Sequence, residues 1–264
     1  MNENSSINHF NLEGWATIKN FIKEDDIKKF TDICLPKSSD IEKEFGTSKN
    51  KDIVYASFKN FGTRSVIKKI FTNKKIQAIF TDRGFKLPFI EHAKVLAKAS
   101  GGPDTPWHQD SDFWNERDPK KSMFTIWIAL TRVTKENGCM VLTKRNVTES
   151  LPHKLVRDGK ERELKNSNHF INGPTSYCEL EPGDALLFNS TLPHCALPNS
   201  TKDPRIALKV VFQDYELRNK SKHLDITSVM FKKGIPGFLN TTFPCSFTKL
   251  RILKNNLLTL LSKT

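Results

Sequence analysis

The chain has 264 residues and a formal net charge of +13, with 37% hydrophobic and 27% charged residues. This is the composition of an ordinary globular protein, and the length suits one large domain. No stretch approaches the roughly 18 apolar residues that a membrane-spanning helix requires. The N-terminus also lacks the basic-then-apolar order of a secretory signal. We therefore expect a cytoplasmic protein with no membrane partner.

Cysteine content and charge argue against several further classes. The five cysteines are scattered and form no C-x-x-C pair, which argues against a disulfide framework and against a cysteine zinc site. Lysines are spread along the whole chain, and no helix-turn-helix, zinc-finger or RNP-like signature accompanies them, so we expect no nucleic-acid partner. The positive field would instead favour small anionic substrates.

The N-terminal third predicts one short strand followed by helices. Residues 10–22 indicate a turn and a strand. Residues 23–34 predict a helix, because acidic residues fill its first turn and apolar residues recur at helical spacing until Pro36 ends it. Apolar residues at the same spacing predict a second helical zone over 64–80.

After Pro88 the pattern becomes one of short strands. Alternating, β-branched and aromatic stretches predict strands at 89–99, 123–133, 139–143, 185–188, 194–197 and 205–214. Residues 144–180 are polar and predict a long irregular excursion over one face of the barrel. A helix is expected near 247–261. Helices followed by many short strands predict a mainly β fold with flanking helices, either a β-sandwich or a jelly roll.

Four residues stand out as a possible metal and carboxylate site. His108 and Asp110 form an H-x-D pair, which on an extended segment places an imidazole and a carboxylate on one face. Alone this pair is weak, because a hydrogen-bonded histidine near a turn explains it equally well. His194 lies 84 residues after Asp110, and Arg205 follows 11 residues later, opening the next strand of an expected hairpin. Two histidines and one carboxylate form a facial triad that leaves three positions open on iron(II).

The runs around these residues resemble the iron(II)- and 2-oxoglutarate-dependent oxygenases of the phytanoyl-CoA dioxygenase (PhyH)-like family. They are WHQD, FTIWIAL, ENGCMVL and PGDALLFNSTLPH, with FNLEGWATIKNFIKEDDIKKF near the N-terminus. The resemblance covers residues 10 to about 215. It implies a double-stranded β-helix (jelly roll, cupin-like) buttressed by N-terminal helices. We expect one domain over 1–264, with a core at about 10–215 and an extension, 216–264, that packs on the barrel.

The resemblance also implies the cofactors and their ligands. Iron(II) would be bound by His108, Asp110 and His194. The co-substrate 2-oxoglutarate would occupy two of the open positions and O2 the third. Arg205 would bind the distal carboxylate of 2-oxoglutarate, since its planar fork suits a carboxylate better than a lysine does. Retention of Asp110 argues against the halogenating variants of the fold, which replace this carboxylate.

Further residues of the co-substrate and substrate pockets follow from the same resemblance. Trp127 matches a strand position that lines the co-substrate pocket in relatives, and Thr125, two residues earlier, shares its face. Lys94, on the first core strand, matches a position from which relatives touch the co-substrate or the substrate. Relatives often have Ser or Thr two residues after the distal histidine, where this chain has Ala196. Trp127 could equally be core and Lys94 a surface residue.

Three aromatic residues flank the metal motif and could form walls of the substrate pocket, although packing explains them equally well. They are Trp107, Phe113 and Trp114.

The expected activity is oxidation of an unactivated C–H bond in a small, anionic metabolite or natural-product intermediate, with release of succinate and CO2. The outcome could be hydroxylation, desaturation or oxidative cyclisation. Two alternatives remain open from sequence. One is a non-catalytic jelly-roll binding module, and the other is an oxygenase directed at nucleic acid or protein, which the positive charge would suit.

Overall fold

A computed structural model gives the fold. It describes residues 3–34, 61–86, 88–114, 123–144, 146–157 and 161–214. Contacts divide the chain into two units, 1–232 and 233–264, and every described residue belongs to the first. The predicted extension 216–264 and its helix lie outside the described residues. Among those residues, no helix is both long and apolar enough to span a membrane.

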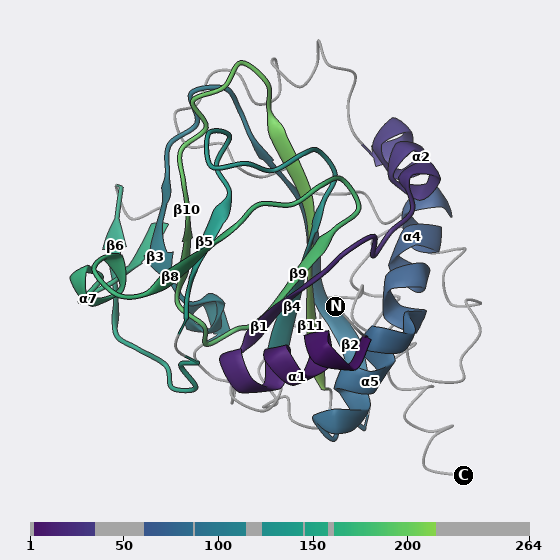
Figure 1. Cartoon of the computed structure of the whole chain (residues 1–264), viewed down its shortest axis with the longest axis horizontal. Coiled ribbons are helices and arrows are strands. Elements are labelled where there is room, and N and C mark those ends of the chain that lie inside the picture. Colours follow the sequence, from purple (N-terminus) through teal and green to yellow (C-terminus); the bar gives the residue numbers. More distant parts are fainter. Residues whose placement is uncertain are drawn as a thin grey trace, which may run out of the picture. The chain divides into compact units, whose positions relative to one another are not determined.

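Two antiparallel sheets form the core (Figure 1). The five-stranded sheet consists, in spatial order, of β1 (Trp15–Ile18), β9 (Ala185–Asn189), β4 (Met123–Ala129), β11 (Arg205–Asp214) and β2 (Pro88–Lys98). The four-stranded sheet consists of β3 (Thr105–His108), β10 (His194–Ala196), β5 (Met140–Thr143) and β8 (Thr175–Cys178). Neighbouring strands are far apart in sequence, as in a jelly roll. The predicted mainly β, jelly-roll class is confirmed.

The strands β10 and β11 do not form the expected hairpin. β10 pairs with β3 and β5, whereas β11 pairs with β2 and β4 in the other sheet. The segment between them crosses from one sheet to the other, and Asn199 within it donates to the backbone carbonyls of Lys98 and Asp203. His194 and Arg205 are therefore presented by opposite sheets, so they can face each other across the barrel.

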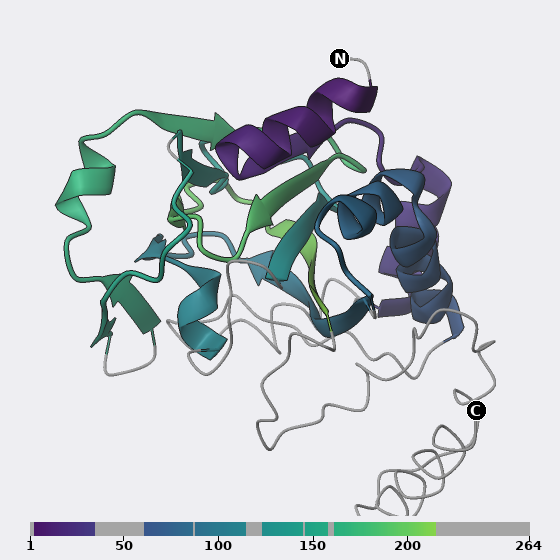
Figure 2. The ribbon, with the colours of Figure 1, turned by 90° about the horizontal axis from the view of Figure 1, so that it is seen from below.

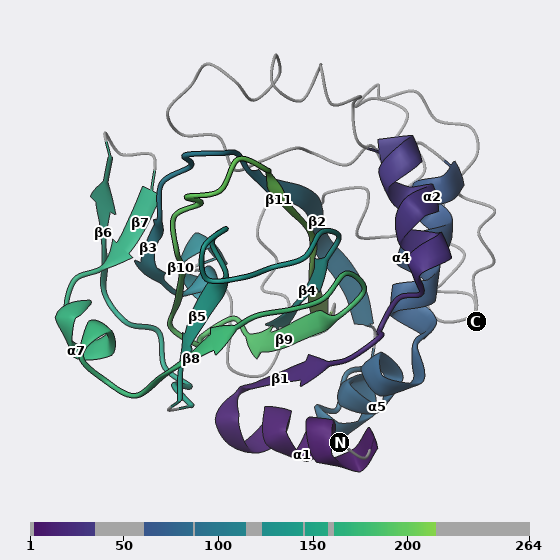
Figure 3. The same ribbon diagram turned by 45° about the horizontal axis from the view of Figure 1, so that its top comes forward.

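Within the described residues, four helices accompany the five-stranded sheet: α1 (Glu3–Glu13), α2 (Glu24–Cys34), α4 (Phe61–Thr72) and α5 (Lys74–Asp82). The predicted helix at 64–80 is broken at Asn73, whose side chain accepts a hydrogen bond from the Lys75 backbone N–H and so caps a new helix. α1 was not predicted, because its polar residues carry no clear apolar stripe. Figures 2 and 3 show α2, α4 and α5 on one side of the β core and α1 next to β1 and α5.

Strand alternation divides the apolar residues into an outer and an inner core. On β4 and β11, Ile126 and Leu208 belong to the cluster that includes residues of the four helices. Their neighbours Trp127 and Ala207 point the other way and belong to a second cluster, together with residues of the four-stranded sheet. The second cluster lies between the two sheets and forms the barrel interior.

Residues 144–180 contain regular structure, so the prediction of an irregular excursion was wrong. They form β6 (His153–Val156), β7 (Glu161–Leu164), the short helix α7 (Asn168–Ile171) and β8, which completes the four-stranded sheet. The hairpin and α7 lie on the side of the β core away from the helices (Figure 3). Half of the residues in the hairpin strands are charged and most are half-exposed, so no hydrophobic period marks these strands.

Candidate metal centre

Two histidines lie side by side in the four-stranded sheet. His108 of β3 and His194 of β10 are register partners, and their ring centroids are 4.2 Å apart. The Nδ1 atoms lie 2.8 Å and 2.9 Å from the carbonyl oxygens of Pro106 and Leu192, respectively. A carbonyl can only accept, so each Nδ1 donates and each Nε2 is left with a lone pair. This is the tautomer that binds a metal ion through Nε2.

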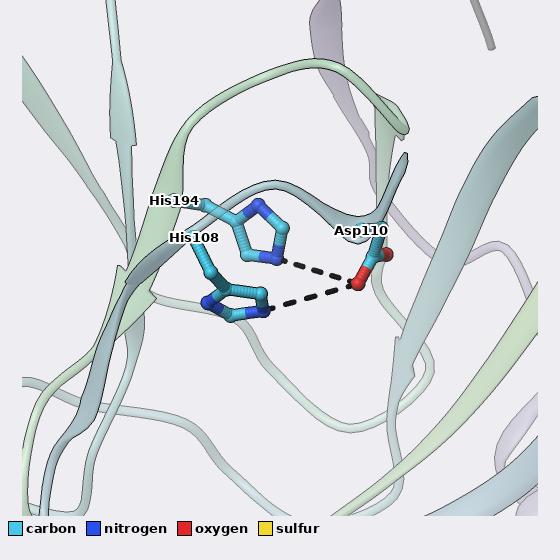
Figure 4. A group of neighbouring side chains, drawn as sticks. All are labelled: His108, Asp110 and His194. Atoms are coloured by element: carbon cyan, nitrogen blue, oxygen red, sulfur yellow. Dashed lines mark ion pairs between the residues drawn. The ribbon is translucent and has the colours of Figure 1, made fainter. Parts of the chain in front are cut away.

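Asp110 completes a group of three possible ligands. It opens the short 3-10 helix η1 (Asp110–Trp114), and its side chain is fully buried. Its Oδ1 lies 3.9 Å from Nε2 of both His108 and His194, and all three ligand atoms lie within 4.8 Å of one another (Figure 4). Metal–ligand bonds of about 2.0–2.2 Å would bring three such atoms onto one ion. The donor set therefore fits a metal site.

The protonation states also suit a metal ion. Burial lowers the pKa of His108 to about 3 and lowers that of His194 as well. Burial would raise the pKa of Asp110, but the Lys209 ammonium outweighs burial and holds that pKa well below its usual range. Both imidazoles are thus neutral near pH 7, so their contacts with Asp110 are not charge pairs. Two neutral imidazoles and one carboxylate are the forms that bind a metal.

Arg205 lies at the start of β11 and is almost completely buried. Its Nη1 donates to the carbonyl oxygen of Gly138 over 3.0 Å, and its guanidinium lies 5.1 Å from the ring centroid of Trp127. Gly138 has a φ of +94°, in the left-handed region that favours glycine. Arg205 and Trp127 are therefore fixed together at the barrel interior.

The structure places the other predicted pocket residues differently. The hydroxyl of Thr125 donates to Asp110 Oδ2 over 3.0 Å, so its observed contact is with the candidate metal carboxylate. Ala196 is buried among the interior residues. The side chains of Lys94, Phe113 and Trp114 lie outside the part of the chain that the structure describes.

The structure places Trp107 on the outer face of β3, where it packs against neighbouring side chains. Its ring stacks on Phe170 at a centroid distance of 6.1 Å and clusters with Val141 and Leu164, separately from the interior residues. Trp107 precedes His108 on β3, and successive side chains of a strand point to opposite faces. The alternation that directs His108 inward therefore directs Trp107 outward, towards the β6–β7 hairpin and α7.

Gln109 and His153 hold the segment 108–110, which carries two candidate ligands, in place. The sequence did not predict this role for either residue. Gln109, between the two candidate ligands, is fully buried. Its side chain donates to the carbonyl oxygen of Glu149 and accepts from the backbone N–H of Leu151, while its own N–H donates to Nε2 of His153. These bonds attach residues 108–110 to residues 149–153, at the start of β6 and just before it. Sequence gives no signal for them, since the partners are some 40 residues apart.

A third residue missed from sequence contacts a candidate ligand directly. Lys209 lies four residues after Arg205 on β11, and its Nζ donates to Asp110 Oδ1 over 2.6 Å. Alternation along β11 could have located it, since Arg205, Ala207 and Lys209 share one face. A lysine on an inward face is rare without a partner, and this partner is distant in sequence.

Comparison with known proteins agrees with the geometry. Residues 10–207 match the family model of phytanoyl-CoA dioxygenase (PhyH). The chain belongs to the phytanoyl-CoA dioxygenase family. The expected cofactors, iron(II), 2-oxoglutarate and O2, are those that this family uses, and the recognition made from sequence motifs is confirmed.

Individual relatives of the phytanoyl-CoA dioxygenase family match over part of their length. Methylphosphonate hydroxylase of Gimesia maris is 30% identical over 119 residues, which are 45% of this chain and 43% of that protein. Phytanoyl-CoA dioxygenase 1 of Oryza sativa subsp. japonica is 25% identical over 159 residues, 57% of this chain and 54% of that protein. The matches thus span about half the length of these relatives.

Solved structures share the fold. The crystal structure of EvdO2 from Micromonospora carbonacea var. aurantiaca complexed with 2-oxoglutarate has a TM-score of 0.55 and 20% identity to this chain. The match covers 80% of this chain and 90% of that chain.

Proposed function

We propose that this chain is an iron(II)- and 2-oxoglutarate-dependent oxygenase that oxidises a C–H bond of a small acidic molecule. The observation that carries the proposal is the convergence of His108, Asp110 and His194, in metal-binding protonation states, inside a barrel that also contains Arg205. A non-catalytic jelly-roll module has no need of two imidazoles whose tautomers are fixed for metal binding, so this observation favours an enzyme.

The chain's own residues would bind and orient the reactants. His108 and His194 offer Nε2 lone pairs and Asp110 offers Oδ1, which leaves open positions on an octahedral ion. Arg205 would bind the distal carboxylate of 2-oxoglutarate through two parallel hydrogen bonds, with Trp127 fixing the plane of its guanidinium. When bound, iron(II) would supply the chemistry that converts R–H, 2-oxoglutarate and O2 to R–OH, succinate and CO2.

The barrel interior would keep bulk water from the reaction. Phe188 packs against the His194 ring at a centroid distance of 4.7 Å, and the other interior residues between the sheets are mostly apolar. An apolar enclosure strengthens the interactions of the few polar groups inside it. The pocket would then decide which C–H bond faces the ion and whether hydroxylation, desaturation or cyclisation results.

Two observations support an acidic substrate. The net charge of +13 would attract small anions towards the protein. The relative in Gimesia maris is named a methylphosphonate hydroxylase, and methylphosphonate is a small anion.

The experiment is succinate formation from 2-oxoglutarate under O2, with and without added iron(II). We expect iron-dependent succinate from the wild-type protein and none above background from His108→Ala. His169→Ala, an exposed histidine on α7, serves as the matched control and should behave as wild type. Equal turnover by wild type and His108→Ala would reject the proposal.

A further inference from the structure

A buried cation inside the barrel has no part in the function as proposed so far. The side chain of Lys209 is only 12% exposed, and its Nζ lies 2.6 Å from Asp110 Oδ1. An ammonium carries three N–H donors. Among the described residues, Asp110 is the acceptor to which it donates. Buried polar groups are normally paired, so the remaining donors are suited to a ligand.

Orientation of Asp110 does not by itself explain a lysine at this position. Oδ1 faces both histidines and is the oxygen proposed to bind the ion, so a divalent ion and an ammonium would share one oxygen. Those two positive groups repel each other. Thr125 already holds Oδ2 with a neutral hydroxyl, which orients the carboxylate without that repulsion. A lysine is favoured here only if a further anion joins it.

The sum of charges in the site with iron(II) and 2-oxoglutarate bound also requires a further anion beside Lys209. This step rests on the proposed function. Iron(II) and Arg205 carry three positive charges, which Asp110 and the two carboxylates of 2-oxoglutarate balance. Lys209 then adds one positive charge that no described interior residue neutralises. A charge in a low-dielectric interior requires a partner. One more anionic group is therefore expected next to Lys209.

The position of Lys209 separates it from the co-substrate's distal carboxylate. Arg205 and Lys209 lie four residues apart on one face of β11, which corresponds to about 13–14 Å along a strand. Lys209 is the register partner of Trp127, whose ring lies beneath the Arg205 guanidinium. The two cations thus mark different ends of the site, with Arg205 at the distal carboxylate and Lys209 beside the metal ligands.

We propose that Lys209 binds the acidic group of the substrate, and that the substrate is a small carboxylic or phosphonic acid oxidised close to that group. Nζ lies 2.6 Å from Asp110 Oδ1. A metal–oxygen bond of about 2.0–2.2 Å and a charge-assisted hydrogen bond of about 2.7–2.9 Å complete the path from ion to anion. The acidic group therefore lies at most about 8 Å from the ion, which places the reacting carbon within a few bonds of it.

The test is equilibrium binding by calorimetry to protein loaded anaerobically with iron(II) and 2-oxoglutarate. The probes are methylphosphonate and acetate, with acetamide as the neutral analogue of acetate. The variants are Lys209→Met, which keeps the length and removes the charge, and Lys209→Arg, which keeps the charge. Lys28→Met, an exposed lysine on α2, is the matched control.

We expect at least one anion to bind the wild-type protein, and acetamide not to bind at the same concentrations. Lys209→Met should weaken that binding by about tenfold or more, as is typical when one partner of a buried charge pair is removed. Lys209→Arg should retain most of it, and Lys28→Met should match wild type. In Lys209→Met the affinity for 2-oxoglutarate should change by less than about threefold, well under the effect of a lost charge pair. The affinity for iron(II) should not fall, because the variant removes the repulsion between the ammonium and the ion.

Three results would overturn the inference. One is equal anion binding by wild type and Lys209→Met. Another is a loss of iron(II) or 2-oxoglutarate affinity in Lys209→Met as large as the loss of anion affinity, which would assign the lysine to Asp110 or to the co-substrate. The third is a loaded wild-type protein that binds neither anion. Failure of the proposed function would show earlier and separately, as no binding of iron(II) or 2-oxoglutarate before any anion is added.

Discussion

Replacement of Asp110 by Asn should destabilise the metal-free protein more than the same replacement at an exposed ion pair. Asp110–Lys209 and Asp26–Lys69 are both Asp–Lys pairs with an N–O distance of 2.6 Å. The side-chain exposures are 0% and 12% in the first pair, against 17% and 55% in the second. Removing one partner of a buried pair costs about 3–5 kcal/mol, whereas an exposed pair contributes about 0.2–1 kcal/mol. Because Asn still accepts one hydrogen bond, we expect about 3 kcal/mol for Asp110→Asn and at most about 1 kcal/mol for Asp26→Asn.

The assay is urea unfolding in the presence of a chelator, with the free energy of unfolding taken for each variant. Combining Asp110→Asn with Lys209→Met removes the stranded ammonium, so the double variant should regain at least about 2 kcal/mol over Asp110→Asn alone. The reasoning is refuted if Asp110→Asn costs no more than Asp26→Asn. It is also refuted if the double variant is no more stable than the Asp110→Asn single variant.

Three further predictions concern pH, the co-substrate and a turn. Because the pKa of His108 falls to about 3 in the folded state, the unfolded chain alone takes up this proton as pH falls from 6 to 4. As pH falls, the free energy of unfolding of the metal-free wild-type protein should therefore decrease more steeply than that of His108→Asn, by about 1.4 kcal/mol per pH unit. Parallel plots of unfolding free energy against pH for the two proteins would contradict this. Arg205→Lys should weaken 2-oxoglutarate binding by about 10- to 100-fold in calorimetry with Mn(II). The control Arg132→Lys, at an exposed arginine, should leave the affinity unchanged. Equal affinities of wild type and Arg205→Lys would show that Arg205 does not bind the co-substrate. Gly138→Ala should cost at least about 2 kcal/mol in urea unfolding, because its Cβ would lie 2.6 Å from a backbone carbonyl oxygen, whereas Gly84→Ala, at positive φ in open space, should cost about 1 kcal/mol. An equal loss of unfolding free energy in Gly138→Ala and Gly84→Ala would show that the close approach of the Gly138 backbone to that carbonyl oxygen is not important for stability.

The candidate ligands could be found from sequence because local geometry links two of them. His108 and Asp110 lie at i and i+2 and so share a face of the extended segment. The third candidate ligand, His194, was found because the run PGDALLFNSTLPH, which ends at it, resembles that of the family. The alternation that places His108 and Asp110 on one face directs the Trp107 side chain to the opposite face of β3, which favours the packing role that the sequence had left open. Lys209 shows the limit of such reasoning. Alternation from Arg205 could have placed it inside the barrel, but its contact with Asp110 depends on two sheets that meet only in the folded chain.

The fold class was predictable because strand patterns after Pro88 are strong, whereas connections and weakly patterned segments were not. The hairpin expected between β10 and β11 failed because proximity in sequence does not determine which sheet a strand joins. The helix α1 and the strands β6 and β7 were missed because their polar residues carry no hydrophobic period. Tertiary contacts form these elements, and a single sequence does not display them.

Metal binding tests the central claim most directly. Anaerobic titration with iron(II) should show one ion per chain for the wild-type protein and for His169→Ala, and an affinity at least about 100-fold lower for His194→Ala, which loses one of three ligands. Undiminished binding by His194→Ala, or no stoichiometric binding by the wild-type protein, would contradict a site built from His108, Asp110 and His194.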